Sequence, residues 1–489
     1  MPDKNVSLRN VADVLGVAPP GREPLILDVH HDSRRTTPRS LFVAIRGERD
    51  DGHDFVGDAV GRGAVAVIAE HQMDIEVPYL LVPDARRALA VAAAVVHRHP
   101  SRAMAVVGIT GTNGKTTVAH MIEAIGTSAG LKTAAVGTLG ARVDDAQIPL
   151  QRTTPESSDL QRILREMADA QVDVVALEVS SHALSLHRVD EIDFRVAVFT
   201  NLSQDHLDFH GDMDSYFAAK QRLFEAGRAQ VGVVNVDDRW GRELVARSGV
   251  RITRVGGEHG NELVVAGGPD HGRSGSLSIR WTGQEAEIQL GLPGRFNIAN
   301  AAVAAAACLE IGVGLADVQA GLESLQRVPG RFELVAGSWS FHVIVDYAHT
   351  PAAVARVIAA AREISSGRVI ALLGAGGNRD ADKRPMMGAA VSRADVAIVT
   401  SDNPRSEDPV AIMNAVEFGV AGPAEVIIEV DRRAAIRAAL AIAGDRDIVL
   451  VLGKGHEQGQ EFDHGRVEPF DDRRVVAEEW DRLLAEVAP

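Results

Sequence analysis

The sequence predicts an α/β protein of several domains, and two observations lead to this expectation. The chain has 489 residues, which is too long for one hydrophobic core and suits about three domains. Short apolar runs alternate with helical patterns along most of the chain, and this alternation is typical of parallel sheets covered by helices. We therefore expect a small N-terminal α/β domain at residues 1–102, a central domain at 103–330 and a C-terminal domain at 331–489.

The composition limits the class of protein and of partner. A hydrophobic content of 46% is ordinary for a globular protein, and a net charge of −16 argues against nucleic acid as a partner. The single cysteine, Cys308, cannot form an internal disulfide, which fits a reducing compartment. No apolar run is long and uncharged enough to span a bilayer, and the N-terminus lacks a signal-peptide pattern. We expect a cytoplasmic protein with no membrane span.

The strand and helix patterns differ between regions. Residues 1–102 contain three apolar runs, SLFVAI, AVAVIAE and YLLV, followed by an alanine-rich helical stretch. Near residues 250–292, two alternating segments, LSIRW and AEIQLGL, predict an antiparallel hairpin at an edge of the central sheet. Beyond residue 331 the predicted strands lie in FHVIVDYAH, RVIALLGAGG, DVAIVTSDNP, AEVIIEV and DIVLVLGKG. Their alternation with helices predicts a doubly wound, Rossmann-like C-terminal domain.

Polar clusters directly follow four of these C-terminal strands, with the sequences DYAHTP, GAGGNRDADKRP, TSDNPRSEDP and GKGHEQGQ. Ligands of open parallel sheets bind outside the carboxyl ends of the strands, so we expect the clusters to line one site. In the third cluster Arg405 stands among three acids, Asp402, Glu407 and Asp408. Turn chemistry explains the Asp, Asn and Pro residues but not the arginine. Arg405 is therefore either part of a solvated surface pair or a cation that binds a ligand.

A strand, a glycine loop and a helix follow one another in VVGITGTNGKTTVAHMIEAIG. Glycines let backbone N–H groups converge on phosphate oxygens, and the helix N-terminus adds its positive dipole end. Lys115 would reach the β- and γ-phosphates, and the Thr116 hydroxyl would bind Mg²⁺. The spacing departs from the standard motif, since Ile109 stands where its first glycine is expected. We predict a central P-loop-type ATPase domain with a mostly parallel sheet.

Acids and imidazoles follow two further strands beside this loop. Glu178 lies near the end of VDVVALEVS, and VAVFTNLSQDHLDFHG runs into a cluster that contains Asp205, His206, Asp208 and His210. Oxygen ligands next to a phosphate loop suggest Mg²⁺, and the absence of a thiolate argues against zinc. The pattern leaves open that His206 and His210 are ordinary hydrogen-bonded loop histidines.

The helical stretch DSYFAAKQRLF places Lys220 near Tyr216, Phe217 and Phe224. From this spacing alone, a surface lysine whose apolar stem lies over the aromatic rings is the favoured interpretation.

Taken together, these motifs resemble the Mur ligases of peptidoglycan synthesis. The shared motifs are GTNGKTT, LEVSSHAL with HRV, TNLSQDHLDFHG, AAKQRLF, GRFNIANAAVA, PGRFE, DYAHTP, DNPR and GKGHE. They run in family order over almost the whole chain, so the resemblance is specific as a set. It implies a uridine-binding N-terminal domain and a ligase that uses ATP and Mg²⁺ to join an amino acid to a UDP-sugar peptide through an acyl phosphate.

In the resembled family, DNPR goes with members that add meso-diaminopimelate to UDP-N-acetylmuramoyl-L-alanyl-D-glutamate, the UDP-N-acetylmuramoyl-dipeptide. The implied catalytic residues are Lys115, His206 and Lys220, the last as a carbamylated lysine. The implied ATP contacts are Gly111, Thr112, Asn113, Gly114, Lys115, Thr116, Thr117, Asn297, Asn300, Arg331 and Asp346. The implied metal contacts are Thr116, Glu178, His206 and Lys220.

The resemblance also implies two groups of substrate contacts. Those to the UDP-sugar peptide are Ser33, Thr153, Thr154, Ser180 and Arg188. Those to the amino acid are Arg379, Asn403, Arg405, Gly453 and Glu457. The chain departs from the pattern at Leu186, where related sequences can carry a glutamine.

Three alternatives remain open at this point. The lysine-adding version of the same ligase shares the overall pattern. Folylpolyglutamate synthase shares the phosphate loop and the architecture, but is not expected to carry a uridine-binding domain or DNPR. A nucleotide-dependent switch would use the loop without ligation, and it leaves the four polar clusters of the C-terminal domain without a role.

Overall fold

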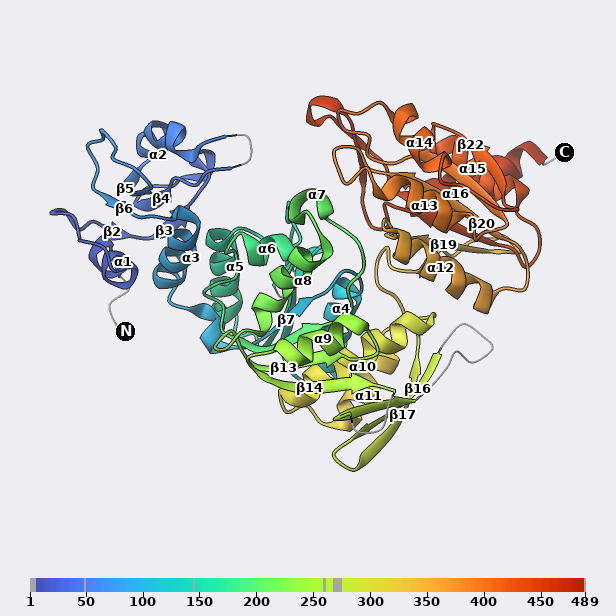
Figure 1. Cartoon of the computed structure of the whole chain (residues 1–489), viewed down its shortest axis with the longest axis horizontal. Helices are drawn as coiled ribbons and strands as arrows, with labels where there is room; N and C mark the ends of the chain where they lie inside the picture. Colours follow the sequence, from blue (N-terminus) through green and yellow to red (C-terminus); the bar gives the residue numbers. More distant parts are fainter. Residues whose placement is uncertain (1–5, 48–49, 144–145, 258–260, 267–274, 488–489) are drawn as a thin grey trace.

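The computed structural model describes residues 6–47, 50–143, 146–257, 261–266 and 275–487. Three main sheets and their helices follow one another along the chain, coloured blue, cyan to yellow, and orange to red in Figure 1. The expected three-domain α/β fold is therefore confirmed. The boundaries at residues 102 and 330 stay predictions.

The N-terminal domain is built on four parallel strands in the order β3-β4-β5-β6. The predicted apolar runs form β4, β5 and β6, and the alanine-rich stretch forms α3, whose small side chains pack closely against the sheet. The strands are Asp28–His30 (β3), Ser40–Val43 (β4), Ala64–Ala69 (β5) and Tyr79–Leu81 (β6). The helices are Leu8–Leu15 (α1), Val56–Gly61 (α2) and Ala85–Val96 (α3), and a small separate sheet pairs Val6–Ser7 (β1) with Leu25–Ile26 (β2).

The central sheet has the strand order β10-β9-β8-β11-β7-β12-β13-β14-β15-β16-β17. Its strands from β8 to β15 are parallel, and β16 and β17 form the predicted antiparallel hairpin. A second antiparallel hairpin, β9 and β10, lies at the opposite edge and was not predicted. Helices α4, α10 and α11 cover one face of the sheet, while α5 and α8 cover the other.

The bounds of the central elements are as follows. The strands are Ala105–Thr110 (β7), Thr133–Gly137 (β8), Gly140–Val143 (β9), Ala146–Ile148 (β10), Val174–Glu178 (β11), Phe194–Phe199 (β12), Ala229–Asn235 (β13), Arg251–Gly256 (β14), Leu263–Ala266 (β15), Gly275–Trp281 (β16) and Gln284–Leu290 (β17). The helices are Lys115–Ser128 (α4), Ser157–Asp169 (α5), Ser181–Ser185 (α6), Leu207–His210 (α7), Met213–Gln221 (α8), Arg239–Arg247 (α9), Arg295–Glu310 (α10) and Leu315–Ser324 (α11).

The C-terminal sheet has the order β18-β19-β23-β20-β21-β22, and its strands from β19 to β22 are parallel. Helices α12, α13 and α14 cover one face and α15 and α16 the other, so the predicted doubly wound domain is confirmed. The strands are Glu333–Leu334 (β18), His342–Asp346 (β19), Val369–Ala375 (β20), Val396–Ser401 (β21), Glu425–Ile428 (β22) and Ile448–Leu452 (β23), and Gly459–Glu461 (β24) pairs with Val467–Pro469 (β25) beyond them. The helices are Pro351–Ile364 (α12), Lys383–Val391 (α13), Pro409–Glu417 (α14), Arg432–Ile442 (α15) and Asp472–Val487 (α16).

Polar contacts join the domains. Arg35 pairs with Asp159 at 2.8 Å between the first and central domains. Between the central and third domains, the Arg331 guanidinium donates to Thr116 Oγ1 at 2.9 Å. Across the described ranges, no helix combines the length and apolar character needed to cross a membrane.

Candidate active site

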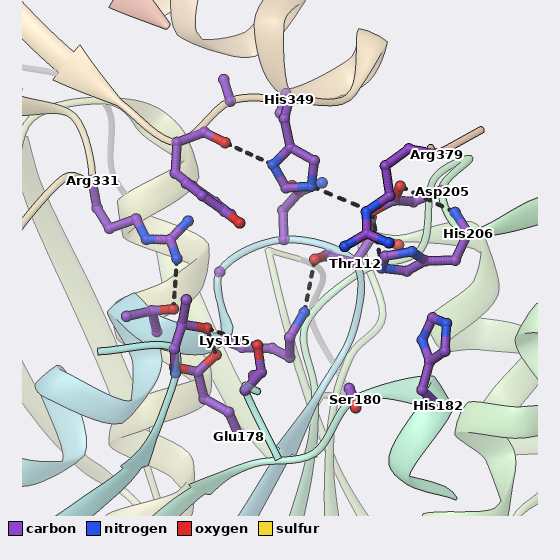
Figure 2. Close-up of a pocket in the computed structure, with 18 of the residues that line it drawn as sticks. Thr112, Lys115, Glu178, Ser180, His182, Asp205, His206, Arg331, His349 and Arg379 are labelled. Atoms are coloured by element: carbon purple, nitrogen blue, oxygen red, sulfur yellow. Dashed lines mark hydrogen bonds and ion pairs between the residues drawn. The ribbon is translucent and has the colours of Figure 1, made fainter. Parts of the chain in front are cut away.

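One cavity of about 1610 Å³ lies where the three domains meet. All four polar clusters of the C-terminal domain line it, because β19, β23, β20 and β21 are neighbouring parallel strands whose carboxyl ends share one edge. The predicted convergence of the clusters is therefore confirmed. Figure 2 shows Arg331 and His349 of the third domain facing Lys115 and Glu178 of the central domain.

The phosphate loop connects β7 to α4 through residues 111–114. Gly111 has a φ of 143°, and a Cβ at this position would collide with Thr200 Oγ1, so a side chain does not fit here. Asn201 holds the next two residues, since its backbone oxygen accepts from Thr112 N at 2.8 Å and its side-chain oxygen from Asn113 N at 3.2 Å. The loop is thereby held against the end of β12, with the N-terminus of α4 at the cavity.

Two lysines approach the carbonyl groups of this loop. Lys115 Nζ donates to the backbone oxygens of Gly111 and Thr112, both at 2.9 Å. Lys220 is only 1% exposed; its Nζ donates to Gly111 O at 2.9 Å and lies 4.6 Å from the centre of the Tyr216 ring. Removal from water lowers the pKa of both lysines, and the nearby Lys115 charge helps to lower the pKa of Lys220 well below its usual value. The surface interpretation of Lys220 is therefore wrong.

The predicted oxygen ligands lie on either side of the loop. Glu178 ends β11 and is 2% exposed; Thr138 N and Thr138 Oγ1 each donate to its carboxylate at 2.9 Å. Thr116 Oγ1 accepts from Arg331. Within the described part of the chain, no three His, Cys, Asp or Glu side chains are grouped to hold a metal by themselves. Mg²⁺ at phosphate-transfer sites is held by one or two carboxylates together with phosphates and water, so this donor set fits Mg²⁺ that arrives with a nucleotide.

Asp205 connects the central and third domains (Figure 2). It is 4% exposed, and its carboxylate lies 3.4 Å from Lys383 Nζ, 3.4 Å from His206 Nε2 and 3.7 Å from His349 Nε2. Burial alone would raise the pKa of Asp205, but the hydrogen bond with His349 and the charge of Lys383 help to bring it well below its usual range. Burial lowers the pKa of His206 to about 3, so its imidazole is neutral at pH 7.

The predicted nucleotide contacts divide into two sets. Arg331, Asp346 and Asn300 line the cavity together with residues 112–117 of the phosphate loop and α4. The Arg331 guanidinium lies 4.5 Å from the centre of the Tyr347 ring. Gly111 and Asn297 do not line the cavity. Asn297 is buried behind Asn300. Asn300 Nδ2 donates to Asn297 Oδ1 at 3.2 Å, so Asn297 holds the Asn300 side chain in place.

Arginines surround the buried Glu156 at the junction of the first and central domains. Arg188 lies 2.8 Å from the Glu156 carboxylate, Arg152 lies 2.9 Å from it and Arg86 lies 3.5 Å from it. Three cations on one carboxylate leave positive charge on this wall of the cavity. The sequence motifs indicated only Arg188. Arg86 belongs to α3 of the first domain, and no motif in the sequence connects it to the other two.

The other predicted sugar-peptide contacts lie at different places relative to the cavity. Thr153, Thr154 and Ser180 line the cavity, as does the apolar Leu186. Ser33 does not line it; this residue is buried and begins a 3₁₀ turn, Ser33–Arg35, whose two arginines are exposed.

His210 also stays outside the cavity lining. Its Nε2 lies 2.9 Å from Ser181 Oγ, as expected for an ordinary loop histidine.

The five predicted amino-acid contacts all line the end of the cavity that lies in the third domain: Arg379, Asn403, Arg405, Gly453 and Glu457. Gly453 has a φ of 113°, and a Cβ there would collide with the Asp402 carboxylate. The loops after β21 and β23 are thus in close contact at this point.

Arg405 has a partner that the sequence did not indicate. Its Nε donates to Glu461 Oε2 and its Nη1 to Gly377 O, both at 2.8 Å. Its backbone N–H also bonds to Glu461 O at 3.0 Å, which helps to hold a left-handed φ of 52°. The side chain is 22% exposed and lies on the cavity wall, so a role in ligand binding stays a prediction beside its ion pair with Glu461.

The acids next to Arg405 in the sequence have other partners. Glu407 pairs with Arg384 at 2.9 Å, and the Asp408 side chain caps the N-terminus of α14. Asp402 lies 3.6 Å from the buried Lys454, a residue that the sequence did not single out.

The chain matches three models of one protein family along its length. Residues 26–110 match the Mur ligase family catalytic domain, residues 109–308 the Mur ligase middle domain, and residues 330–455 the Mur ligase glutamate ligase domain.

Related proteins extend over the same length. A Streptomyces coelicolor protein named UDP-N-acetylmuramoyl-L-alanyl-D-glutamate–2,6-diaminopimelate ligase is 43% identical, with 96% of each chain covered. A protein of the same name from Syntrophomonas wolfei is 41% identical, with 96% of this chain and 97% of its own covered. A solved structure of a protein with that name is 29% identical, covers 98% of this chain and 99% of its own, and has a TM-score of 0.68. This chain therefore belongs to the Mur ligase family.

Proposed function

We propose that this protein is an ATP-dependent ligase that adds meso-diaminopimelate to UDP-N-acetylmuramoyl-L-alanyl-D-glutamate. One observation carries the proposal: a single cavity joins a phosphate loop to a pocket that contains Arg405, Asn403 and Glu457. The names of full-length relatives at 41–43% identity support the same substrates. We place the reaction in the cytoplasm, because it consumes ATP.

The reaction needs an activated carboxylate, since oxide is a poor leaving group. A carboxylate oxygen of the dipeptide substrate attacks the γ-phosphorus of ATP, ADP leaves, and an acyl phosphate forms. The neutral amine of the amino acid then attacks the acyl carbon, inorganic phosphate leaves, and the nitrogen gives up a proton as the amide forms. The two anions that meet in the first step repel each other, so the site needs fixed positive charge.

This chain carries that charge around the phosphate loop. Lys115 would exchange its backbone partners for the β- and γ-phosphate oxygens, and Arg331 would contact the nucleotide from the third domain. Asn300 and Asp346 would complete the nucleotide side, and Asn297 would hold Asn300 in place. The third domain would also exclude water from the acyl phosphate.

Thr116 and Glu178 would hold Mg²⁺, with His206 as a further contact, and the metal would offset the repulsion between the two anions. We propose that Lys220 is carbamylated to complete this set. Its lowered pKa favours the neutral amine, which can attack CO₂ and lose a proton to give an anionic carbamate. A carbamate oxygen is a hard ligand of the kind that Mg²⁺ prefers.

The other substrates would occupy opposite ends of the cavity. Ser33 in the first domain remains our proposed contact on the uridine side. Arg188, with its neighbours Arg86 and Arg152, would attract the anionic groups of the UDP-sugar peptide, and Thr153, Thr154 and Ser180 would contact its peptide portion.

The amino-acid end suits a ligand with two charges on its distal carbon. Diaminopimelate carries a carboxylate and an amine there, whereas lysine ends in an amine alone. An arginine fork matches a carboxylate, and the carboxylate of Glu457 matches an ammonium. Arg379 would add a second cation on the same wall.

The decisive experiment is the dependence of ADP release on each cosubstrate. Purified protein with ATP and Mg²⁺ should release ADP only when both the UDP-sugar dipeptide and meso-diaminopimelate are present. Turnover with L-lysine that equals or exceeds turnover with meso-diaminopimelate would contradict the proposed specificity. ATP hydrolysis that is indifferent to both cosubstrates would instead favour a nucleotide switch.

A further inference from the structure

Lys454 is a charged side chain with no exposure to solvent, on the loop that follows β23. An ammonium group in such a place is costly unless hydrogen-bonded acceptors and negative charges surround it. Its Nζ donates to Asn403 Oδ1 at 2.8 Å and to Glu457 Oε2 at 3.1 Å, and lies 3.6 Å from Asp402 Oδ1. All four residues belong to the wall at the amino-acid end of the cavity or lie directly behind it.

These contacts join two loops that follow non-adjacent strands of the sheet. Asp402 and Asn403 follow β21, whereas Lys454 and Glu457 follow β23, and β20 lies between the two strands. The Lys454 side chain therefore reaches past the carboxyl end of β20 and adds a charged contact to the hydrogen bond between Gln460 Nε2 and Asp402 O, which also joins the two loops.

Lys454 also helps to set the orientation of the Asn403 amide. A lysine ammonium has only donors, so the Asn403 oxygen must face it. That oxygen also accepts from Glu461 N at 3.0 Å, which leaves Asn403 Nδ2 to donate to Glu457 Oε2 at 2.8 Å.

Glu457 is held on one side only. Its Oε2 accepts hydrogen bonds from both Lys454 Nζ and Asn403 Nδ2, while the described residues provide no hydrogen bond to Oε1. The carboxylate is 30% exposed and lines the cavity, so Oε1 is available to a bound cation.

We propose that Lys454 is a positioning residue for the amino-acid ligand: it orients Asn403 and Glu457 for the distal ammonium of the diamino acid, and its charge offsets the repulsion between Glu457 and Asp402. This inference rests on the proposed function. Lys454 does not touch the ligand and acts through Asn403 and Glu457. Without it the Asn403 oxygen keeps only the Glu461 N–H as a donor, and two carboxylates lie close together without a cation between them.

The test is the variant Lys454→Met, which keeps an unbranched side chain of similar length but removes the charge and all three donors. Charge-assisted hydrogen bonds contribute enough that we expect KM for meso-diaminopimelate to rise about 10-fold or more. KM for ATP and for the UDP-sugar dipeptide should stay unchanged, and kcat should change less than KM for the amino acid. A general structural defect would instead alter all three KM values together.

Lys132→Met is the matched control. Lys132 Nζ donates to the Ala170 backbone oxygen at 2.7 Å in the central domain and does not line the cavity, so all three KM values should stay at the wild-type level. Circular dichroism and thermal unfolding establish that each variant is folded. If Lys454→Met does not fold, Lys454→Gln keeps an N–H donor in the same buried space and is measured in its place.

A double-mutant cycle with Glu457→Gln tests whether Lys454 acts on the amino-acid ligand through Glu457. If Lys454 acts through Glu457, then adding Lys454→Met to Glu457→Gln should raise KM for the amino acid much less than Lys454→Met does alone. A folded Lys454 variant with unchanged KM for meso-diaminopimelate overturns this inference alone. A wild-type protein that releases no ADP with meso-diaminopimelate overturns the proposed function and the inference together.

Discussion

The buried lysines near the two ends of the cavity differ in the charge of their hydrogen-bond partners. At the phosphate-loop end, Lys115 and Lys220 donate to neutral backbone carbonyls, and the described residues form no ion pair with either lysine. At the amino-acid end, Lys454 donates to the Asn403 amide and the Glu457 carboxylate and lies close to the Asp402 carboxylate. The cations are alike, but their partners differ in charge.

This difference separates groups that would act on reactants from groups that would hold the site in shape. A lysine whose partners are neutral carbonyls has positive charge, or a free amine, to offer to an incoming phosphate or to CO₂. A lysine enclosed by carboxylates has its charge already compensated, and it stabilises the arrangement of its neighbours instead. Lys115 and Lys220 are thus suited to chemistry, and Lys454 to positioning.

The largest effect is expected at Lys115. Lys115→Ala should lower kcat by about 10³-fold, because the transferring phosphate loses a fixed cation in a site screened from water. ADP release measures the loss, and circular dichroism should show an unchanged fold, since Lys115 bonds only to two carbonyls of its own loop. Lys132→Ala serves as the control, and a normal kcat for Lys115→Ala would remove this residue from the phosphate site.

The next effect is expected at Lys220. Lys220→Ala should lower kcat by about 10²-fold, because it removes the proposed anionic ligand of Mg²⁺ from a buried position. A short carboxylic acid such as acetate should restore part of the activity by entering the space that the side chain leaves. Wild-type activity in the variant would show that the carbamate proposal is wrong.

At the amino-acid end we expect an effect on binding more than on rate. Arg405→Ala should raise KM for meso-diaminopimelate about 10- to 100-fold, as expected for the loss of a charge-assisted pair, while KM for ATP stays unchanged. The control is Arg466→Ala, which removes an exposed pair with Glu468 on the nearby β25. An unchanged KM for the amino acid would leave Arg405 with only its structural bond to Glu461.

The smallest effect is expected at Tyr216. Tyr216→Phe removes the hydrogen bond of 3.2 Å between the Tyr216 hydroxyl and Thr112 Oγ1 but keeps the ring beside Lys220 Nζ. One neutral hydrogen bond contributes about 1 kcal/mol, so kcat should fall by less than about 10-fold. A loss as large as that of Lys220→Ala would mean that the hydroxyl takes part in holding the reactants.

Much of the architecture was predictable because its signals are local. The apolar runs of the third domain predicted parallel strands, and the polar clusters after them predicted a shared site. The departure at Ile109 also has a local explanation, since this residue is part of β7 and is fully buried. The antiparallel hairpin β9 and β10 was missed, because its short strands carry little apolar alternation.

The partners and the burial of individual charged side chains were much harder to predict. Lys220 is buried because its helix α8 packs against the phosphate loop, whereas the sequence spacing alone favoured a position of this lysine on the surface. The sequence suggested the neighbouring acids as partners of Arg405, whereas its carboxylate partner is Glu461, 56 residues further along the chain. Asn297, Ser33 and Lys220 carry the expected residue types but do not line the cavity.

The sequence by itself determined the strand order along the chain, the phosphate loop and the family motifs, because apolar periodicity and glycine spacing act over a few residues. Only the tertiary structure decided partners such as those of Lys220 and Arg331, because these partners are far apart in the chain. Lys220 and Gly111 are separated by 109 residues, and Arg331 and Thr116 by 215. The energy of a buried charge depends on which groups surround it in space, and the folding within each domain and the packing between domains bring those groups together.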